Sequence, residues 1–133
     1  MGAGGARFVV RGLTLDAGAL IGIERGSSRV RALLLGRDEP GAVRVPAPVL
    51  AQVWRADARQ AELNRFLNTR PVEIVRFDAA AARSAGGLLA AAGSHDVVDA
   101  AVVVCAWQRD DTVVTSDPDD LRRLDPSLSI VAL

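Results

Sequence analysis

Residues 13–21 read LTLDAGALI, an apolar strand pattern that stops at Asp16 and passes directly into a helix pattern. The first three residues favour a short strand, and residues 17–24 favour a helix. Asp16 therefore stands where a strand ends, with apolar residues on both sides. A carboxylate in this setting is either the N-cap of the following helix or part of a functional site.

The same alternation of strand and helix patterns continues along the chain. Further strands are predicted at residues 42–45, 72–75, 113–114 and 129–132, and helices at residues 29–35, 46–54, 59–67, 79–92 and 96–108, with a short helical turn after Asp117. This alternation predicts one α/β domain over residues 12–133, a three-layer α/β/α sandwich around a mostly parallel sheet of about five short strands. The glycine-rich residues 1–11 are predicted to form a flexible N-terminal segment.

The composition narrows the classes of function. The chain has 133 residues and a formal net charge of zero, so RNA binding would depend on a local basic face. All sixteen basic residues are arginines, which excludes Walker-type phosphate loops and lysine Schiff bases. The lone Cys105 sits in an apolar setting and cannot form an internal disulfide. Because no apolar run approaches the roughly 20 residues of a membrane span and no secretory signal is visible, we expect a cytoplasmic protein.

Three aspartates are the candidate catalytic and metal-binding residues. Asp16 and Asp117 each follow a predicted strand, and ligands of parallel sheets gather beyond the carboxyl ends of the strands. Asp99 lies on a helix among valines and alanines, where an unpaired carboxylate is costly. If the three converge, their repulsion raises their pKa values unless a cation such as Mg²⁺ or Mn²⁺ neutralises them. Asp96 is a weaker fourth ligand, since a helix N-terminus already explains it, and Asp16 and Asp117 could also be caps.

Three segments of the chain, taken in order, resemble the PIN-domain family, and especially the VapC-type toxins of bacterial toxin–antitoxin pairs. They are residues 13–21, Asp96-Val97-Val98-Asp99-Ala100, and residues 113–121, which read VVTSDPDDL. The resemblance implies a metal-dependent ribonuclease, a cognate antitoxin as partner and a homodimer. It places Asp16, Asp99 and Asp117 on the acidic positions of the family, with Asp96 as a neighbour. Ser116 or Thr115 would then hydrogen-bond a metal-bound water or a carboxylate.

One position departs from the family pattern. Members commonly carry a glutamate on the helix after the second strand, where this chain has Gln52. An amide keeps an acceptor oxygen but loses the charge, so metal affinity should weaken. Glu24 on the first helix is a candidate replacement. The alternative hypothesis is therefore a weakly active or inactive PIN scaffold that binds an antitoxin-like partner.

Other features are less specific. Five arginines flank the predicted acidic edge and could contact RNA, although exposed arginines are common on helices; they are Arg25, Arg29, Arg31, Arg55 and Arg59. Trp54 and Trp107 are predicted to be core or interface residues. A receiver domain is excluded by the missing lysine, and a dehalogenase-like phosphatase by the absence of a second acid two residues after Asp16.

Overall fold

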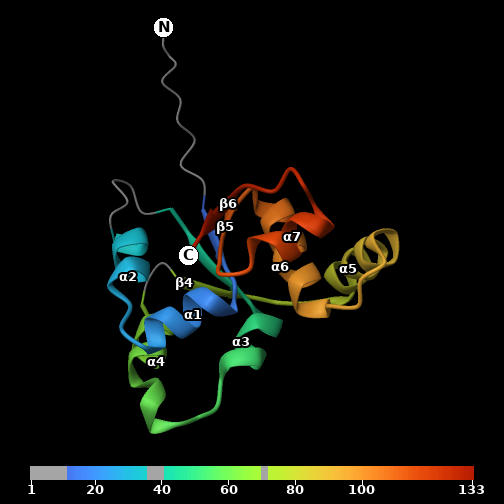
Figure 1. Cartoon of the computed structure of the whole chain (residues 1–133). Coiled ribbons are helices and arrows are strands. Elements are labelled where there is room, and N and C mark those ends of the chain that lie inside the picture. Colours follow the sequence, from blue (N-terminus) through green and yellow to red (C-terminus); the bar gives the residue numbers. More distant parts are fainter. Residues whose placement is uncertain (1–11, 36–40, 70–71) are drawn as a thin grey trace, which may run out of the picture.

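A computed structural model describes residues 12–35, 41–69 and 72–133 of the chain (Figure 1). The predicted N-terminal segment, residues 1–11, lies outside the described residues. The strands are β2 (Leu13–Leu15), β3 (Val43–Pro46), β4 (Val72–Val75), β5 (Thr112–Thr115) and β6 (Ile130–Ala132). The helices are α1 (Ala17–Glu24), α2 (Ser28–Leu35), α3 (Ala47–Val53), the 3₁₀ helix η1 (Ala58–Gln60), α4 (Ala61–Leu67), α5 (Ala79–Ala92), α6 (Val97–Arg109) and α7 (Pro118–Leu124).

The five described strands form one sheet in the order β4-β3-β2-β5-β6. Every neighbouring pair is parallel, with Leu13 opposite Val43 on one side of β2 and Leu15 opposite Val114 on the other. The predicted parallel sheet is therefore confirmed. Since β2 and β5 are adjacent and run in the same direction, the residues that follow them, Asp16 and Ser116, reach the same edge.

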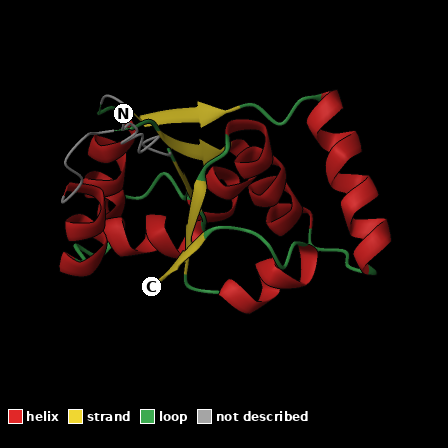
Figure 2. Ribbon diagram, turned by 90° about the horizontal axis from the view of Figure 1, so that it is seen from above, coloured by secondary structure: helices red, strands yellow, loops and turns green. Residues whose placement is uncertain are grey.

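Helices cover both faces of this sheet, which confirms the predicted three-layer architecture. Figure 1 shows α1, α2 and α4 on one side of the strands and α5, α6 and α7 on the other, and Figure 2 shows the same arrangement from above. Helix α6 is buried from Ala100 to Ala106. The core between the layers includes Leu15, Leu20, Val45 and Val103, all with fully buried side chains. Burial of such side chains is the main force that holds the layers together.

Local signals in the sequence set most element ends. Asp78 caps α5 by accepting a hydrogen bond from the Ala81 amide at 2.8 Å, and Gly93 ends the same helix with a φ of 66°. A left-handed φ of this kind favours glycine. Two predictions were wrong in detail. Pro46 ends β3 and is the N-cap of α3, so of the two prolines only Pro48 lies in the first helical turn. Residues 59–67 do not form one helix, because a 3₁₀ turn ending at the buried Gln60 precedes α4.

Cys105 is 3% exposed, as its apolar setting predicts. Trp54 and Trp107 are 37% and 49% exposed, so neither belongs to the core. The Trp107 indole instead donates a hydrogen bond to the Asp125 carboxylate at 2.7 Å.

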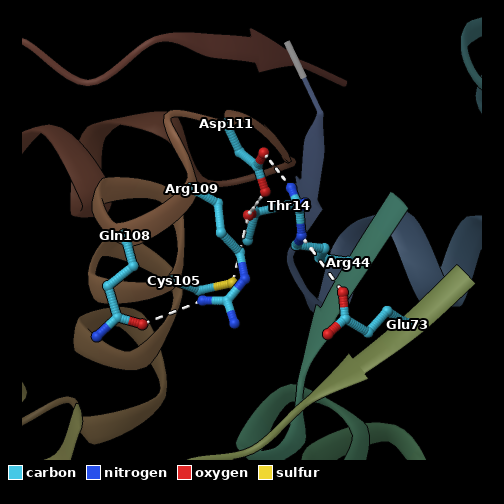
Figure 3. A network of polar contacts seen from close by, with 7 residues as sticks. All are labelled: Thr14, Arg44, Glu73, Cys105, Gln108, Arg109 and Asp111. Atoms are coloured by element: carbon cyan, nitrogen blue, oxygen red, sulfur yellow. Dashed lines mark hydrogen bonds and ion pairs between the residues drawn. The ribbon is translucent and has the colours of Figure 1, made fainter. Parts of the chain in front are cut away.

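A buried ionic network joins β2, β3 and β4 to the residue before β5 (Figure 3). The Asp111 carboxylate, only 3% exposed, accepts a hydrogen bond from the Thr14 hydroxyl at 2.8 Å and from the Arg44 guanidinium at 2.6 Å. Arg44 also lies 3.5 Å from the Glu73 carboxylate. A Cβ at Gly12 would collide with both Asp111 and Arg44. The amino end of the sheet is thus closed around a paired carboxylate that the sequence pattern did not reveal.

Within the described ranges, no single helix is long and apolar enough to cross a membrane. Helices α5 and α6 meet that length and composition only when taken together, as a pair bent by 115°.

Candidate acidic site

Asp16 lies at the carboxyl end of β2 and is 5% exposed. One carboxylate oxygen accepts a hydrogen bond from the Ala17 amide at 2.7 Å, and the other accepts one from the Thr115 hydroxyl at 2.8 Å. Burial raises the pKa of Asp16, and the charges of Asp117 and Asp96 raise it further against the opposing effect of these hydrogen bonds. Asp16 therefore caps α1 and is also a buried carboxylate whose charged form is disfavoured by burial and by the neighbouring aspartates.

Thr115 connects the two strand ends. Its hydroxyl donates to Asp16 and accepts a hydrogen bond from the Asp117 amide at 2.9 Å. This contact agrees with the prediction that Thr115 or Ser116 would bind a carboxylate. Asp117 itself is exposed, and although it occupies the N-cap position of α7 its side chain makes no capping hydrogen bond. The capping role therefore does not account for the Asp117 carboxylate.

Gly18 allows α1 to approach the loop after β5. A Cβ at this position would lie 2.8 Å from the Ser116 Cβ, closer than real Cβ contacts allow, and would also overlap the Ser116 hydroxyl. Any larger residue would push the first turn of α1 away from Ser116. Gly18 therefore fixes the spacing between the first turn of α1 and the loop after β5. Its role follows from this contact and not from the sequence pattern.

Asp96 and Asp99 approach the same edge from α6. Asp96 is exposed and caps the helix by accepting a hydrogen bond from the Asp99 amide at 2.9 Å. Burial raises the pKa of Asp99 to about 7, and the charges of Asp96, Asp16 and Asp120 contribute in that order. Asp96, Asp99 and Asp120 line a cavity of about 310 Å³ together with Arg123. The electrostatic coupling shows that the acidic residues lie within reach of one another's charge.

The donor set suits a hard divalent cation, because it consists of carboxylate oxygens without a paired cation. In the part of the chain that the structure describes, no salt bridge is made by any of the four predicted ligands, Asp16, Asp96, Asp99 and Asp117. As the side chains lie, however, no three acidic, histidine or cysteine residues of these ranges are placed to hold one ion together. Like charges repel, and the carboxylates of Asp16 and Asp96 accept backbone amides instead. The shared metal site stays a prediction.

Gln52 does not line the cavity of Asp96 and Asp99. It is exposed on α3 and lines a separate cavity of about 590 Å³, to which Glu24 also contributes. Glu24 and Gln52 thus line the same cavity, and the role of Glu24 as a replacement for the missing glutamate stays a prediction. Of the five candidate arginines, three line this cavity, namely Arg25, Arg55 and Arg59.

The other two candidate arginines are used elsewhere. Arg29 donates a hydrogen bond to the backbone oxygen of Ala132 at 2.9 Å. Arg31 lines a different cavity, formed with Ile23, Phe66 and neighbouring residues. Neither is part of the cavity around Gln52.

Along the chain, one aspartate follows β2, a second lies on α6 and a third follows β5. This order of acidic residues can be compared with known families. The family model described as PIN domain matches residues 13–126. The chain belongs to the PIN-domain family. Comparison with curated proteins gives no significant match for this PIN domain.

Solved structures share the fold of this PIN domain. VapBC2 from Rickettsia felis, bound to a DNA fragment from its promoter, matches with a TM-score of 0.72 and 19% identity over 92% of this chain and 98% of that one. DNA-bound VapBC from Salmonella typhimurium matches with a TM-score of 0.65 and 20% identity over 92% and 98%. VapC20 from Mycobacterium tuberculosis, described as a toxin that cleaves the sarcin-ricin loop, matches with a TM-score of 0.58 and 16% identity over 76% and 86%. At these identities the likeness establishes the fold alone.

Proposed function

We propose that this PIN domain is a metal-dependent endoribonuclease and the toxin of a toxin–antitoxin pair. The observation that carries the proposal is the buried Asp16, which lies within reach of the charge of Asp117 and has hydrogen-bond donors but no cation as partners in the described ranges. Burying a carboxylate without a cationic partner costs folding free energy. Where such carboxylates lie at the ligand-binding edge of a parallel sheet, they indicate a functional site. The family membership and the VapC20 neighbour support RNA as the substrate.

Asp16, Asp99 and Asp117 would hold Mg²⁺ or Mn²⁺, with Asp96 at the edge of the group. Such a cation, when bound, supplies Lewis-acid activation of water and offsets the negative charge of the phosphodiester. Thr115 keeps Asp16 oriented and ties the Asp117 backbone to it, so the two strand ends move as one unit. With a pKa of about 7, Asp99 is half protonated near neutral pH and responds to any positive charge placed beside it.

An antitoxin partner belongs to the same proposal. Two of the similar structures are VapBC complexes bound to DNA, and this chain covers 98% of the matched chain in each. We extend the proposal to a homodimer and to a cytoplasmic location, which accords with the buried, unpaired Cys105.

A second candidate function is a binding scaffold with little or no nuclease activity. The observation that favours it is Gln52, which is neutral and lies in the arginine-lined cavity apart from Asp96 and Asp99. Under this hypothesis the acidic group receives a basic side chain of the partner in place of a metal ion.

The test compares RNA cleavage by the purified protein with Mn²⁺ and with EDTA. Asp16→Asn should reduce metal-dependent cleavage by about a hundredfold or more, the size expected when a charged group that stabilises the transition state is removed. Asp119→Asn is the matched control, because Asp119 lies two residues after Asp117 with a side chain that is 91% exposed. Equal cleavage by the wild type and Asp16→Asn would contradict the nuclease assignment. Absence of cleavage by the wild type on any RNA, together with antitoxin binding that depends on Asp16, would favour the scaffold.

A further inference from the structure

The cavity around Gln52 differs in charge from the cavity lined by Asp96, Asp99 and Asp120. Arg25, Arg55 and Arg59 line it against the single carboxylate of Glu24. The acidic cavity shows the reverse balance, with three aspartates against Arg123. Ala17 lines the arginine cavity and directly follows Asp16, so the cavity reaches the residue next to a proposed metal ligand.

The loop that carries two of these arginines is held by buried contacts. Gln60 is 3% exposed and uses both ends of its amide. Its oxygen accepts a hydrogen bond from the Arg55 amide at 2.9 Å, and its nitrogen donates one to the Val53 carbonyl at 2.9 Å. Between Arg55 and Asp57, Ala56 has a φ of 54°. A left-handed conformation at an alanine is unfavourable and is kept only where the surroundings enforce it.

In the described part of the chain, the internal partners of these arginine side chains are exposed ones. Arg59 donates two hydrogen bonds to the Asp57 carboxylate, from Nη2 at 3.0 Å and from Nε at 3.4 Å, but the two side chains are 88% and 36% exposed, so the pair contributes little to stability. The Arg55 guanidinium donates to the Trp54 carbonyl at 2.8 Å in an exposed setting. A guanidinium has further donors in a planar fork, whose geometry suits phosphate oxygens.

We propose that this cavity binds a backbone phosphate of the RNA next to the scissile one, with Arg25, Arg55 and Arg59 as its cationic ligands and the Gln52 amide as a neutral donor. The proposal rests on the proposed nuclease function. It gives Gln52 a role of its own: a glutamate at position 52 would place a second carboxylate among the arginines and would repel the phosphate. A neutral amide at this position avoids that repulsion.

The experiment measures binding of a short fluorescein-labelled single-stranded RNA by anisotropy in EDTA, where no divalent cation contributes. Gln52→Glu and Arg55→Gln should each weaken binding about tenfold, since each removes or opposes one charge-assisted contact. The slope of log K against log salt should fall by about 0.7 for each phosphate that the variant no longer binds. Arg83→Gln on the exposed face of α5 is the matched control and should bind RNA as the wild type does. Circular dichroism verifies that each variant is folded.

Unchanged RNA binding by Gln52→Glu and Arg55→Gln would overturn the proposal. The result also separates this site from the nuclease function. If cleavage requires Asp16 while binding in EDTA ignores Arg55 and Gln52, the nuclease stands and the phosphate site is wrong. If binding depends on Arg55 and Gln52 but Asp16→Asn cleaves like the wild type, the phosphate site stands and the nuclease assignment to Asp16 is wrong.

Discussion

Asp16 and Asp111 are both buried aspartates, the first after the carboxyl end of β2 and the second before the amino end of β5. They are 5% and 3% exposed. Asp111 receives the Arg44 guanidinium at 2.6 Å and the Thr14 hydroxyl at 2.8 Å. Among the described residues, Asp16 receives only the Ala17 amide and the Thr115 hydroxyl, and its pKa is raised by burial and by neighbouring aspartates. Within the described residues, a cationic side chain pairs with Asp111 at the amino end of the sheet, and none pairs with Asp16 at the carboxyl end. Under the proposed function, the cation for Asp16 comes from outside the chain.

The presence or absence of a cationic partner distinguishes a structural aspartate from a functional one better than the degree of burial does. A buried ion pair of good geometry can be a neutral structural element, but breaking it leaves an isolated charge that is costly. A buried carboxylate that lacks such a partner lowers stability in the folded protein, and proteins keep this kind of residue where it serves a site. Removing the cation at the amino end is therefore expected to lower stability. Neutralising an aspartate at the carboxyl end is expected to lower activity without that loss of stability.

The largest effect on stability is expected from Arg44→Met, which removes the cation from the amino end. Asp111 would then be buried without a charged partner, and the free energy of unfolding should fall by about 3 to 5 kcal/mol. Urea denaturation followed by circular dichroism measures the change. The double variant Arg44→Met/Asp111→Asn should recover part of the loss, because the isolated charge is gone. A loss below about 1 kcal/mol for the single variant would mean that the pair is no better than a surface salt bridge.

A smaller effect is expected from Gly18→Ala at the carboxyl end. The new Cβ would overlap Ser116, so α1 must shift, at a cost of about 1 to 3 kcal/mol. The matched control is Gly86→Ala on α5, where a Cβ meets no atom within 4 Å. That control should stabilise the protein by about 0.5 to 1 kcal/mol through its higher helix propensity. Destabilisation of both variants to the same degree would show that the contact between α1 and Ser116 is not the cause.

The pH dependence of stability tests whether the pKa of Asp99 is raised in the folded protein. The pKa of Asp99 is about 7 in the folded protein and lies above the unfolded value of 3.8. The contribution of Asp99 to the free energy of unfolding is therefore fully present below pH 4 and is lost as the pH rises through 7. Asp99→Asn cannot lose a proton and should be more stable than the wild type at pH 8 by about 1 to 2 kcal/mol, a value reduced by solvent screening. Melting temperatures of both proteins between pH 4 and 8 measure this. Parallel curves over the whole range would show that the pKa of Asp99 is not raised in the folded protein.

Much of the fold could be predicted from the sequence because its signals are local. Residues 13–21 encode a strand, a cap and a helix in one continuous run, and β4 and α5 begin and end where the pattern places them. The 3₁₀ turn before α4 could not be predicted, since it depends on buried hydrogen bonds from Gln60 to residues 53 and 55. Helical periodicity carries no information on such contacts.

The candidate site was only partly predictable for the same reason. Asp16 and Asp117 could be singled out because each follows a predicted strand, and parallel strands bring their carboxyl ends together. A contact from Thr115 was expected only from the family resemblance. Asp111 and Arg44 could not be paired from the sequence, since they are 67 positions apart and Asp111 resembles an ordinary surface residue after a helix. Gly18 shows its role only through a contact made across the fold.

The most direct test of the central claim is the effect of Mn²⁺ on thermal unfolding. Mn²⁺ at about ten times its dissociation constant should stabilise the wild type by about 1.4 kcal/mol, and Asp16→Asn should gain far less. Asp119→Asn, with its exposed side chain, should respond like the wild type. An equal rise in melting temperature for the wild type and Asp16→Asn, or no rise in either, would contradict the claim that the carboxyl end of this sheet is built to receive a divalent cation.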